Sequence, residues 1–318
     1  MKHPAYFASI HPNKTAYRMA SSGDAMTFAE LDRLSNQGAQ TFRSLGVGPG
    51  ENIALLFENR LDFLALCWAA QRSGLFYTAI SHHLTPGEIA YIVRDCEARI
   101  VVVSDAFEHL LGDLQGACEH ARFFVCGDTD DPTLDWRALR SSMPATPIAD
   151  EAAGSDLLYS SGTTGRPKGV MRVFDRKPIN TVIPALMTVL CETLGGMGED
   201  TIYLSPAPLY HAAPLRFSMM TAMLGGTAII MEKFDAEECL ALIEREKVSH
   251  SQFVPTMFVR MLKLPETTRR KYNPSIPSPL ALLTAAASSG PSAPPIGAWM
   301  IGSSIFRSLH RFVFTRSP

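Results

Sequence analysis

Apolar side chains in the first 130 residues follow two alternating patterns, one with helical spacing and one with the short continuous runs of buried strands. Thr27 and Glu30 form a capping-box pattern, and apolar residues follow at helical spacing until Gly46. Residues 53–57 then make an apolar run of strand length. This alternation predicts a parallel sheet with crossover helices, and therefore an α/β protein.

The alternation continues along most of the chain. Thr85, Pro86 and Glu88 mark the start of one helix, because they supply a cap, a proline at the first helical position and a glutamate that closes the box. Asp235 and Glu238 mark the start of another. Further strands are predicted at residues 76–80, 99–103, 122–125, 156–159, 201–205, 227–231 and 251–254.

Residues 129–151 are rich in Asp, Pro, Ser and Ala and show no sustained period, which is typical of a connection. We therefore expect a first α/β subdomain over residues 1–150 and a second over residues 151–272. Residues 273–318 differ in kind and are expected to form a poorly ordered tail. Between Asn273 and Phe306 there is no charged residue, and prolines recur throughout.

Composition narrows the classes of function. The 318 residues are 46% apolar, which allows a sizeable core, and the net charge of -2 leaves no basic surface of the kind that binds nucleic acid. The six cysteines are scattered without a CxxC pair, as expected for reduced core thiols in a cytoplasmic protein. No signal peptide is expected at the start, and the prolines of the tail argue against a membrane helix.

The candidate chemistry lies in a loop of small residues that follows the predicted strand at 156–159. Its glycines let backbone N–H groups approach a phosphate, its hydroxyls add donors, and Lys168 adds a positive charge. Pro167 before Lys168 and Gly169 after it separate the loop from the Walker pattern. Taken alone, the loop fits either a phosphate site or a flexible surface turn. The residues predicted to hold phosphate are Ser160, Ser161, Gly162, Thr163, Thr164, Gly165 and Lys168.

The segment YSSGTTGRPKGV, residues 159–170, resembles the signature loop of the adenylate-forming superfamily, which contains acyl-CoA synthetases, luciferases and adenylation domains of peptide synthetases. Four other segments resemble family blocks in the expected order, from TFAELDRLSNQGAQTFRSLGVGPGENIALLFEN and HHLTPGEIAYIVRDCEARIVVVSD to PLYHAAPL and SHSQFVPTMFVRMLKLPE. The last two are most similar to bacterial fatty-acyl or medium-chain acyl-CoA synthetases. The resemblance covers roughly residues 15–272.

This resemblance implies doubly wound parallel sheets with flanking helices, as in part of the N-terminal domain of the synthetase fold. It also implies ATP-dependent activation of a carboxylic acid, followed by transfer to coenzyme A, with Mg²⁺ near Thr164. Lys168, Thr164 and His211 are the implied catalytic residues. Tyr210 and His211 match a family block beside the acyl group and adenylate, although His211 alone also fits a structural histidine. Val254, Pro255 and Thr256 are expected to line the acyl pocket, although such a run is equally typical of plain core.

We expect the resemblance to the family to stop after Tyr272. The blocks that would bind adenine and ribose, and the C-terminal domain with its catalytic lysine, are not found there. The tail contains three arginines and no acid, whereas residues 1–272 contain 31 acids. We therefore expect that a frameshift or truncation replaced the rest, which would leave an inactive or impaired chain. Two other interpretations stay open: a non-catalytic acyl- or phosphate-binding fragment, and an adenylation domain for an aromatic or amino acid.

Overall fold

The computed structural model describes residues 1–160, 167–169, 173–182, 185–272, 282–283 and 299–300. Contacts divide the chain into two compact units. The first contains residues 1–15, 26–185 and 209–212, and the second contains residues 16–25, 186–208 and 213–318. The subdomain limits expected from the sequence (1–150, 151–272 and 273–318) stay predictions.

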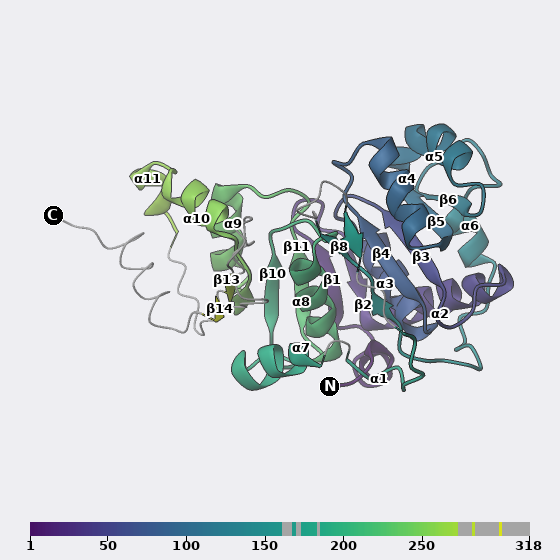
Figure 1. The fold of residues 1–318 in the computed structure, drawn as a ribbon. Coiled ribbons are helices and arrows are strands. Elements are labelled where there is room, and N and C mark those ends of the chain that lie inside the picture. Colours follow the sequence, from purple (N-terminus) through teal and green to yellow (C-terminus); the bar gives the residue numbers. More distant parts are fainter. Residues whose placement is uncertain (161–166, 170–172, 183–184, 273–281, 284–298, 301–318) are drawn as a thin grey trace. The chain divides into compact units, whose positions relative to one another are not determined.

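The first unit is built on a five-stranded sheet in the order β6-β5-β3-β4-β7 (Figure 1). Every neighbouring pair in this sheet is parallel. The strands are β3 (Asn52–Leu56), β4 (Phe76–Ile80), β5 (Ala98–Ser104), β6 (Arg122–Cys126) and β7 (Ser155–Asp156). The expected α/β class with a parallel sheet is confirmed.

Local sequence signals place the helices of this unit. Thr27 and Thr85 each form a complete capping box at the start of α2 and α4, as predicted. The helices are α1 (Pro4–Ile10), α2 (Phe28–Ser44), α3 (Leu61–Arg72), α4 (Pro86–Asp95), the 3₁₀ helix η1 (Asp105–Leu110), α5 (Leu111–Ala117) and α6 (Trp136–Ser141).

Helices cover both faces of this sheet. One face packs α4 and α5 against alternate residues of the strands, among them Leu56, Val101 and Val125, because side chains two apart share a face. On the other face, the Trp136 ring of α6 lies between Phe42 of α2 and Phe124 of β6, at centroid distances of 5.2 and 5.9 Å. The unit is therefore a three-layer, doubly wound structure.

The second unit contains a sheet in the order β12-β10-β11-β1-β2. Strands β10, β11, β12 and β1 are joined by parallel pairs. The strands of this sheet are β1 (Thr15–Met19), β2 (Ala25–Thr27), β10 (Ile202–Ser205), β11 (Thr227–Ile230) and β12 (His250–Ser251), of which Thr15, Met26 and Thr27 are counted with the first unit. A separate pair is formed by β13 (Leu282–Leu283) and β14 (Trp299–Met300). Its helices are α7 (Leu186–Thr188), the π-helix η2 (Val189–Leu194), α8 (Ala212–Met223), α9 (Ala236–Arg245), α10 (Pro255–Leu262) and α11 (Glu266–Arg269).

Two predicted strands differ from the structure. The strand expected at residues 156–159 is divided between β7 and a second short strand, β8 (Tyr159–Ser160), which pairs antiparallel with β9 (Lys168–Gly169). The strand expected at residues 251–254 ends at Ser251, because Pro255 occupies the first turn of α10 and Val254 is its N-cap.

The segment 129–151 also contains more structure than its composition indicates. The short helix α6 begins after Asp135, whose carboxylate accepts a hydrogen bond from the Ala138 backbone N–H at 3.0 Å. Its six residues bury only Trp136 and Arg140, which is too few to produce a visible helical period.

The cysteines form no disulfide bonds in the structure. All six cysteines are free and buried, as expected for core thiols.

Among the described residues, no helix combines the length and apolar character that crossing a bilayer requires.

His3 at the start of α1 gives a testable pH dependence. Its ring accepts a hydrogen bond from Ala5 N–H at 3.2 Å and lies edge-on to Trp68, and burial together with the nearby Arg72 lowers the pKa of His3 to about 3. The unfolded chain takes up a proton near pH 6.5 and the folded chain does not, so stability falls as pH drops below 6.5. Between pH 7.5 and 5.0 this group should remove about 2 kcal/mol of unfolding free energy.

Urea unfolding of the wild type and His3→Asn at both pH values measures this effect. Asparagine keeps an acceptor at the N-cap but has no proton to gain. The fall in stability should therefore be about 2 kcal/mol smaller in the variant. An equal fall in both proteins would show that His3 is not the responsible group.

Candidate functional site

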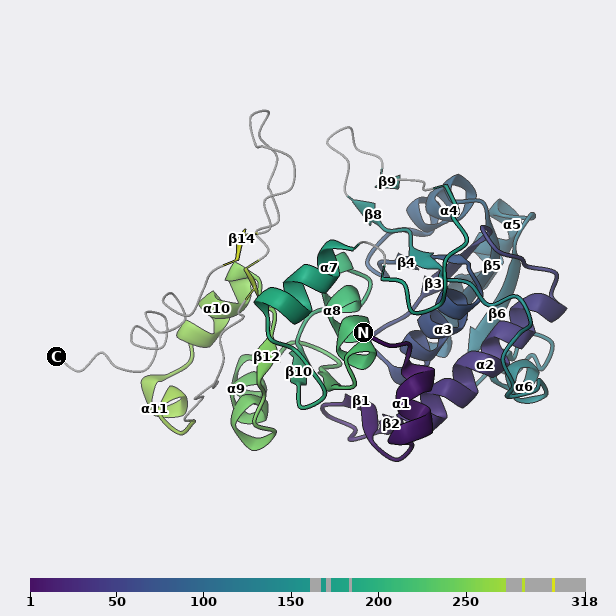
Figure 2. The same cartoon turned by 90° about the horizontal axis from the view of Figure 1, so that it is seen from below.

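The predicted phosphate loop begins and ends in the hairpin of β8 and β9, which Figure 2 shows beside α4. Tyr159 is opposite Gly169, and Ser160 is opposite Lys168. Lys168 is exposed. The predicted contributions of Ser161, Gly162, Thr163, Thr164 and Gly165, and of the Ser160 side chain, lie outside the described part of the chain.

A second candidate region lies at the carboxyl ends of β3 and β4. The chain leaves β4 through α4 on one face of the sheet, whereas α3, which follows β3, packs with α2 on the other face. Ligands of open parallel sheets bind outside the carboxyl ends of strands at such a reversal. A ring nitrogen of His82, after β4, lies 3.2 Å from the carbonyl oxygen of Phe57, after β3. The backbone N–H of Leu209 donates to Asn59 Oδ1 at 2.8 Å, which holds the segment 209–212 there.

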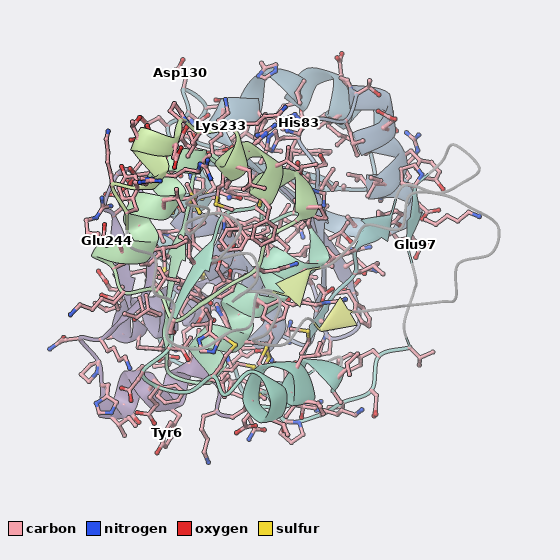
Figure 3. All side chains as sticks on the ribbon, turned by 90° about the vertical axis from the view of Figure 1, so that its left-hand side faces the viewer. Tyr6, His83, Glu97, Asp130, Lys233 and Glu244 are labelled. Atoms are coloured by element: carbon pink, nitrogen blue, oxygen red, sulfur yellow. The ribbon has the colours of Figure 1, made fainter. Side chains whose placement is uncertain are left out.

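Five rings gather at this point. The His82 ring is stacked on Phe107 (5.1 Å between centroids, 17° between planes) and is edge-on to Tyr210 (5.3 Å, 88°). His83 lies 4.3 Å from His82, and His211 lies 4.5 Å from Tyr210. His83 is exposed at the surface of the first unit (Figure 3). The structure therefore brings the predicted pair Tyr210 and His211 together with two further histidines.

Two imidazoles of this cluster, those of His82 and His211, favour the neutral form. Partial desolvation, with His83 as a further cause, lowers the pKa of both His82 and His211 below the ordinary value. A neutral imidazole has one donor and one acceptor nitrogen. His82 and His211 can therefore form hydrogen bonds at neutral pH without adding full positive charges.

His82, His83 and Phe107 were not among the candidate site residues. One signal for the histidines is present in the sequence, since the pair follows the buried apolar strand β4 after a single residue, Ser81, and thus stands at the carboxyl edge of a predicted parallel sheet. Phe107 gives no comparable signal, because its place beside His82 depends on the neighbouring positions of β5 and β3.

The predicted acyl-pocket residues Val254, Pro255 and Thr256 belong to the second unit. Val254 is half-buried and packs against that unit's apolar core, which includes Phe253 and Met257. Pro255 and Thr256 are exposed at the start of α10. Their role beside an acyl group stays a prediction.

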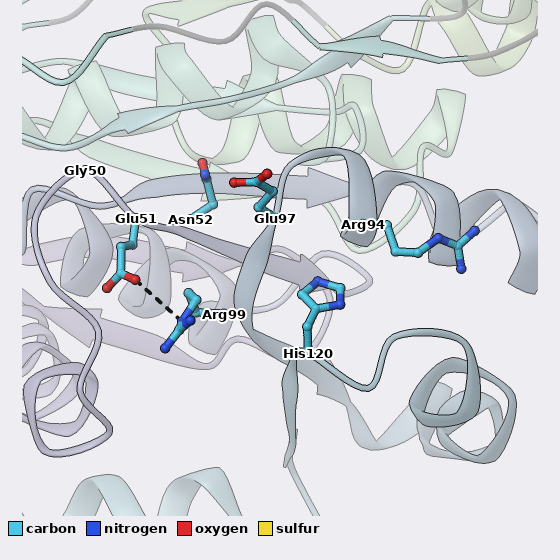
Figure 4. Close-up of a pocket in the computed structure, with 7 residues that line it drawn as sticks. All are labelled: Gly50, Glu51, Asn52, Arg94, Glu97, Arg99 and His120. Carbon is cyan, nitrogen blue, oxygen red and sulfur yellow. Dashed lines mark ion pairs between the residues drawn. The ribbon is translucent and has the colours of Figure 1, made fainter.

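A cavity of about 600 Å³ lies at the amino end of β3 and β5 (Figure 4). Its charged groups are largely occupied with one another or with the backbone: Glu51 pairs with Arg99 at 3.5 Å, and Arg94 donates to the Ala117 carbonyl at 2.9 Å. None of the predicted site residues lines it. The lining residues are Gly50, Glu51, Asn52, Arg94, Glu97, Arg99 and His120.

The chain matches a known protein family over most of its length. The family model described as AMP-binding enzyme matches residues 5–306. The chain belongs to the AMP-binding enzyme family. The matched range extends past Tyr272, where the resemblance was expected to stop, into the segment expected to form a non-family tail.

Two similar AMP-binding enzymes are named for different acids. The chain is 28% identical over 269 residues to the long-chain-fatty-acid–CoA ligase FadD13 of Mycobacterium tuberculosis, a match that covers 81% of this chain and 50% of the relative. It is 31% identical over 250 residues to 4-coumarate–CoA ligase 5 of Oryza sativa subsp. japonica, covering 76% and 45%. The chain thus spans about half the length of these relatives, and their acids differ.

Solved structures of this family share the fold. The inhibitor-bound N-terminal domain of FACL13 from Mycobacterium tuberculosis superposes with a TM-score of 0.72 at 25% identity, covering 87% of this chain and 68% of that domain. The expected likeness to the N-terminal domain of a synthetase is therefore confirmed.

Proposed function

We propose that the protein activates a carboxylic acid with ATP and transfers the acyl group to coenzyme A. In the first step the substrate carboxylate attacks the α-phosphorus, pyrophosphate leaves and an acyl adenylate forms. In the second step the sulfur of coenzyme A attacks the acyl carbon, and AMP leaves. The observation that supports this proposal is the signature loop at residues 159–170, inside a family match that covers most of the chain.

The phosphate side of the site is assigned to the hairpin and its loop. The backbone and hydroxyls of the loop would hold the β- and γ-phosphates, and Lys168 would balance their charge. The exposed ammonium of Lys168 is accessible to such a ligand. Positioning and charge neutralisation, rather than a protein nucleophile, would carry the reaction.

Mg²⁺ is assigned to the same phosphates, with Thr164 as its protein ligand. The ion would neutralise charge on the phosphate oxygens. The residues that the structure describes contain no group of three or more His, Cys, Asp or Glu side chains placed for a metal. Thr164, the assigned protein ligand, lies outside the described residues.

The acid side of the site is assigned to Tyr210 and His211, with Val254, Pro255 and Thr256. A fatty or medium-chain acid is the first candidate substrate, supported by the fatty-acid ligase relative. An aromatic acid is the second, supported by the 4-coumarate ligase relative and by the ring cluster around His82, since aromatic rings stack favourably. ATP and coenzyme A, the expected co-substrates, support a cytoplasmic location.

Exchange of labelled pyrophosphate into ATP, measured with and without acids, tests the proposal. Medium-chain fatty, long-chain fatty and aromatic acids should be compared at equal concentrations. Exchange that depends on one class of acid would support the activation step and identify the substrate class. Absence of exchange with every acid would reject catalysis by this chain and favour the alternative of a non-catalytic binding fragment.

A further inference from the structure

Tyr159 connects the hairpin to the body of the first unit. Its ring faces Gly169 across the hairpin, so closely that a Cβ added at Gly169 would lie 2.7 Å from Tyr159 Cζ. Non-bonded carbon atoms are normally about 3.5–4.0 Å apart, so this distance is too short for a real contact. A side chain at position 169 would therefore displace the Tyr159 ring from its place against the strand that carries Lys168.

The hydroxyl of Tyr159 reaches α4. It donates a hydrogen bond to Asp95 Oδ2 at 2.5 Å. Asp95 Oδ1 accepts a second one from the Tyr91 hydroxyl at 3.3 Å, one helical turn earlier in α4. Burial, with the Asp95 contact as a second cause, raises the pKa of Tyr159, so its hydroxyl keeps the proton that it donates. One carboxylate is thus held between two tyrosines from separate elements.

We propose that Asp95, oriented by Tyr91, is a positioning residue that fixes the β8–β9 hairpin to α4 through Tyr159 and thereby sets the place of Lys168. The assignment of phosphate binding to Lys168 comes from the proposed function, on which this part of the inference rests. Hydrogen bonds to a charged acceptor are stronger than neutral ones and are well suited to such a task.

A simpler interpretation is that only the Tyr159 ring matters. The ring packs against the apolar core under α4, and this contact would persist without the hydroxyl. Tyr159→Phe separates the two interpretations, because it keeps the ring and removes the hydrogen bond to Asp95.

Cleavage by trypsin after Lys168 reports on the hairpin in the full chain. Trypsin does not cut after Arg166, because Pro167 follows it, but Arg172 and Arg176 are further cleavage sites nearby. Mass spectrometry of the fragments therefore has to follow the one whose new N-terminus is Gly169. Tyr159→Phe and Asp95→Ala should each raise the cleavage rate there about threefold to tenfold, as expected for the loss of one hydrogen bond that water partly screens. Asp95→Asn keeps an acceptor oxygen and should give a smaller rise.

Tyr272→Phe is the matched control. It removes a tyrosine–carboxylate bond of the same kind, from Tyr272 to Glu237 at 3.1 Å, in the second unit. Its cleavage rate after Lys168 should equal that of the wild type. The proposed anchor, which is the hydrogen bond from Tyr159 to Asp95, would be rejected if the cleavage rate of Tyr159→Phe also equalled that of the wild type. It would be rejected as well if Tyr272→Phe raised the rate as much as Tyr159→Phe.

Calorimetric titration with inorganic tripolyphosphate separates the anchor from the proposed function. If Asp95 and Tyr159 position Lys168, Tyr159→Phe should weaken tripolyphosphate binding about threefold to tenfold, and Lys168→Ala should weaken it further. If Lys168→Ala bound like the wild type, phosphate binding by Lys168 would be rejected, while the trypsin rates would still decide the anchor. If Lys168→Ala lost binding and Tyr159→Phe kept it in full, the positioning role would be rejected.

Discussion

Replacing Arg72 with alanine is expected to lower the free energy of unfolding by about 3 kcal/mol or more. The Arg72 side chain is only 1% exposed at the end of α3. Its guanidinium contacts Asp32 Oδ1 at 3.0 Å, Glu151 Oε1 at 2.7 Å and Ser35 Oγ at 2.9 Å. Removing it would leave a cavity and two carboxylates that lose their partner.

The size of this effect depends on burial. Asp32 and Glu151 are 28% and 22% exposed, so water can partly replace the lost partner and hold the cost near the lower end of the range. Arg72→Lys should also destabilise, because one ammonium cannot reproduce the planar guanidinium that reaches three partners.

Urea unfolding at constant pH measures the change, with Arg99→Ala as the matched control. Arg99 also pairs with a glutamate, at 3.5 Å from Glu51, but its side chain is 53% exposed. Its removal should cost less than about 1 kcal/mol. Similar losses in the two variants would contradict the structural role assigned to the buried arginine.

The helices and strands of the first unit were largely predictable because their signals are local. The capping boxes at Thr27 and Thr85 involve residues three apart, and the strand β4 has the predicted bounds of residues 76–80. Arg72 shows the opposite case. Its partners Asp32 and Glu151 are 40 and 79 residues away in the chain, and no local pattern indicates which carboxylates the folded chain brings to it.

The candidate site was predictable only in part for the same reason. The resemblance named Tyr210 and His211, but the rings that surround Tyr210 come from the ends of β4 and β5. A sequence pattern predicts the ends of strands, whereas the order β6-β5-β3-β4-β7 decides which ends are neighbours. Likewise, the small-residue loop predicted a phosphate site without indicating that Tyr159 would attach it to α4.

Lys168→Ala should reduce acid-dependent exchange of pyrophosphate into ATP about a hundredfold or more, as expected when a preorganised charge is removed from a phosphate site. Lys168→Arg should keep part of the activity, because it preserves the positive charge but changes its shape and reach. The exchange rate should therefore be highest in the wild type, lower in the arginine variant and lowest in the alanine variant.

Lys177→Ala provides the control for this order. Lys177 is also an exposed lysine of the first unit, and it pairs with Asp175 at 3.1 Å. Losing a surface ion pair should change stability by less than about 1 kcal/mol and leave exchange unchanged. If both alanine variants lost exchange equally, the effect would reflect general charge rather than a phosphate contact. If Lys168→Ala exchanged as well as the wild type, Lys168 would not be the residue that neutralises the departing pyrophosphate, and the phosphate-binding assignment of the hairpin would be wrong.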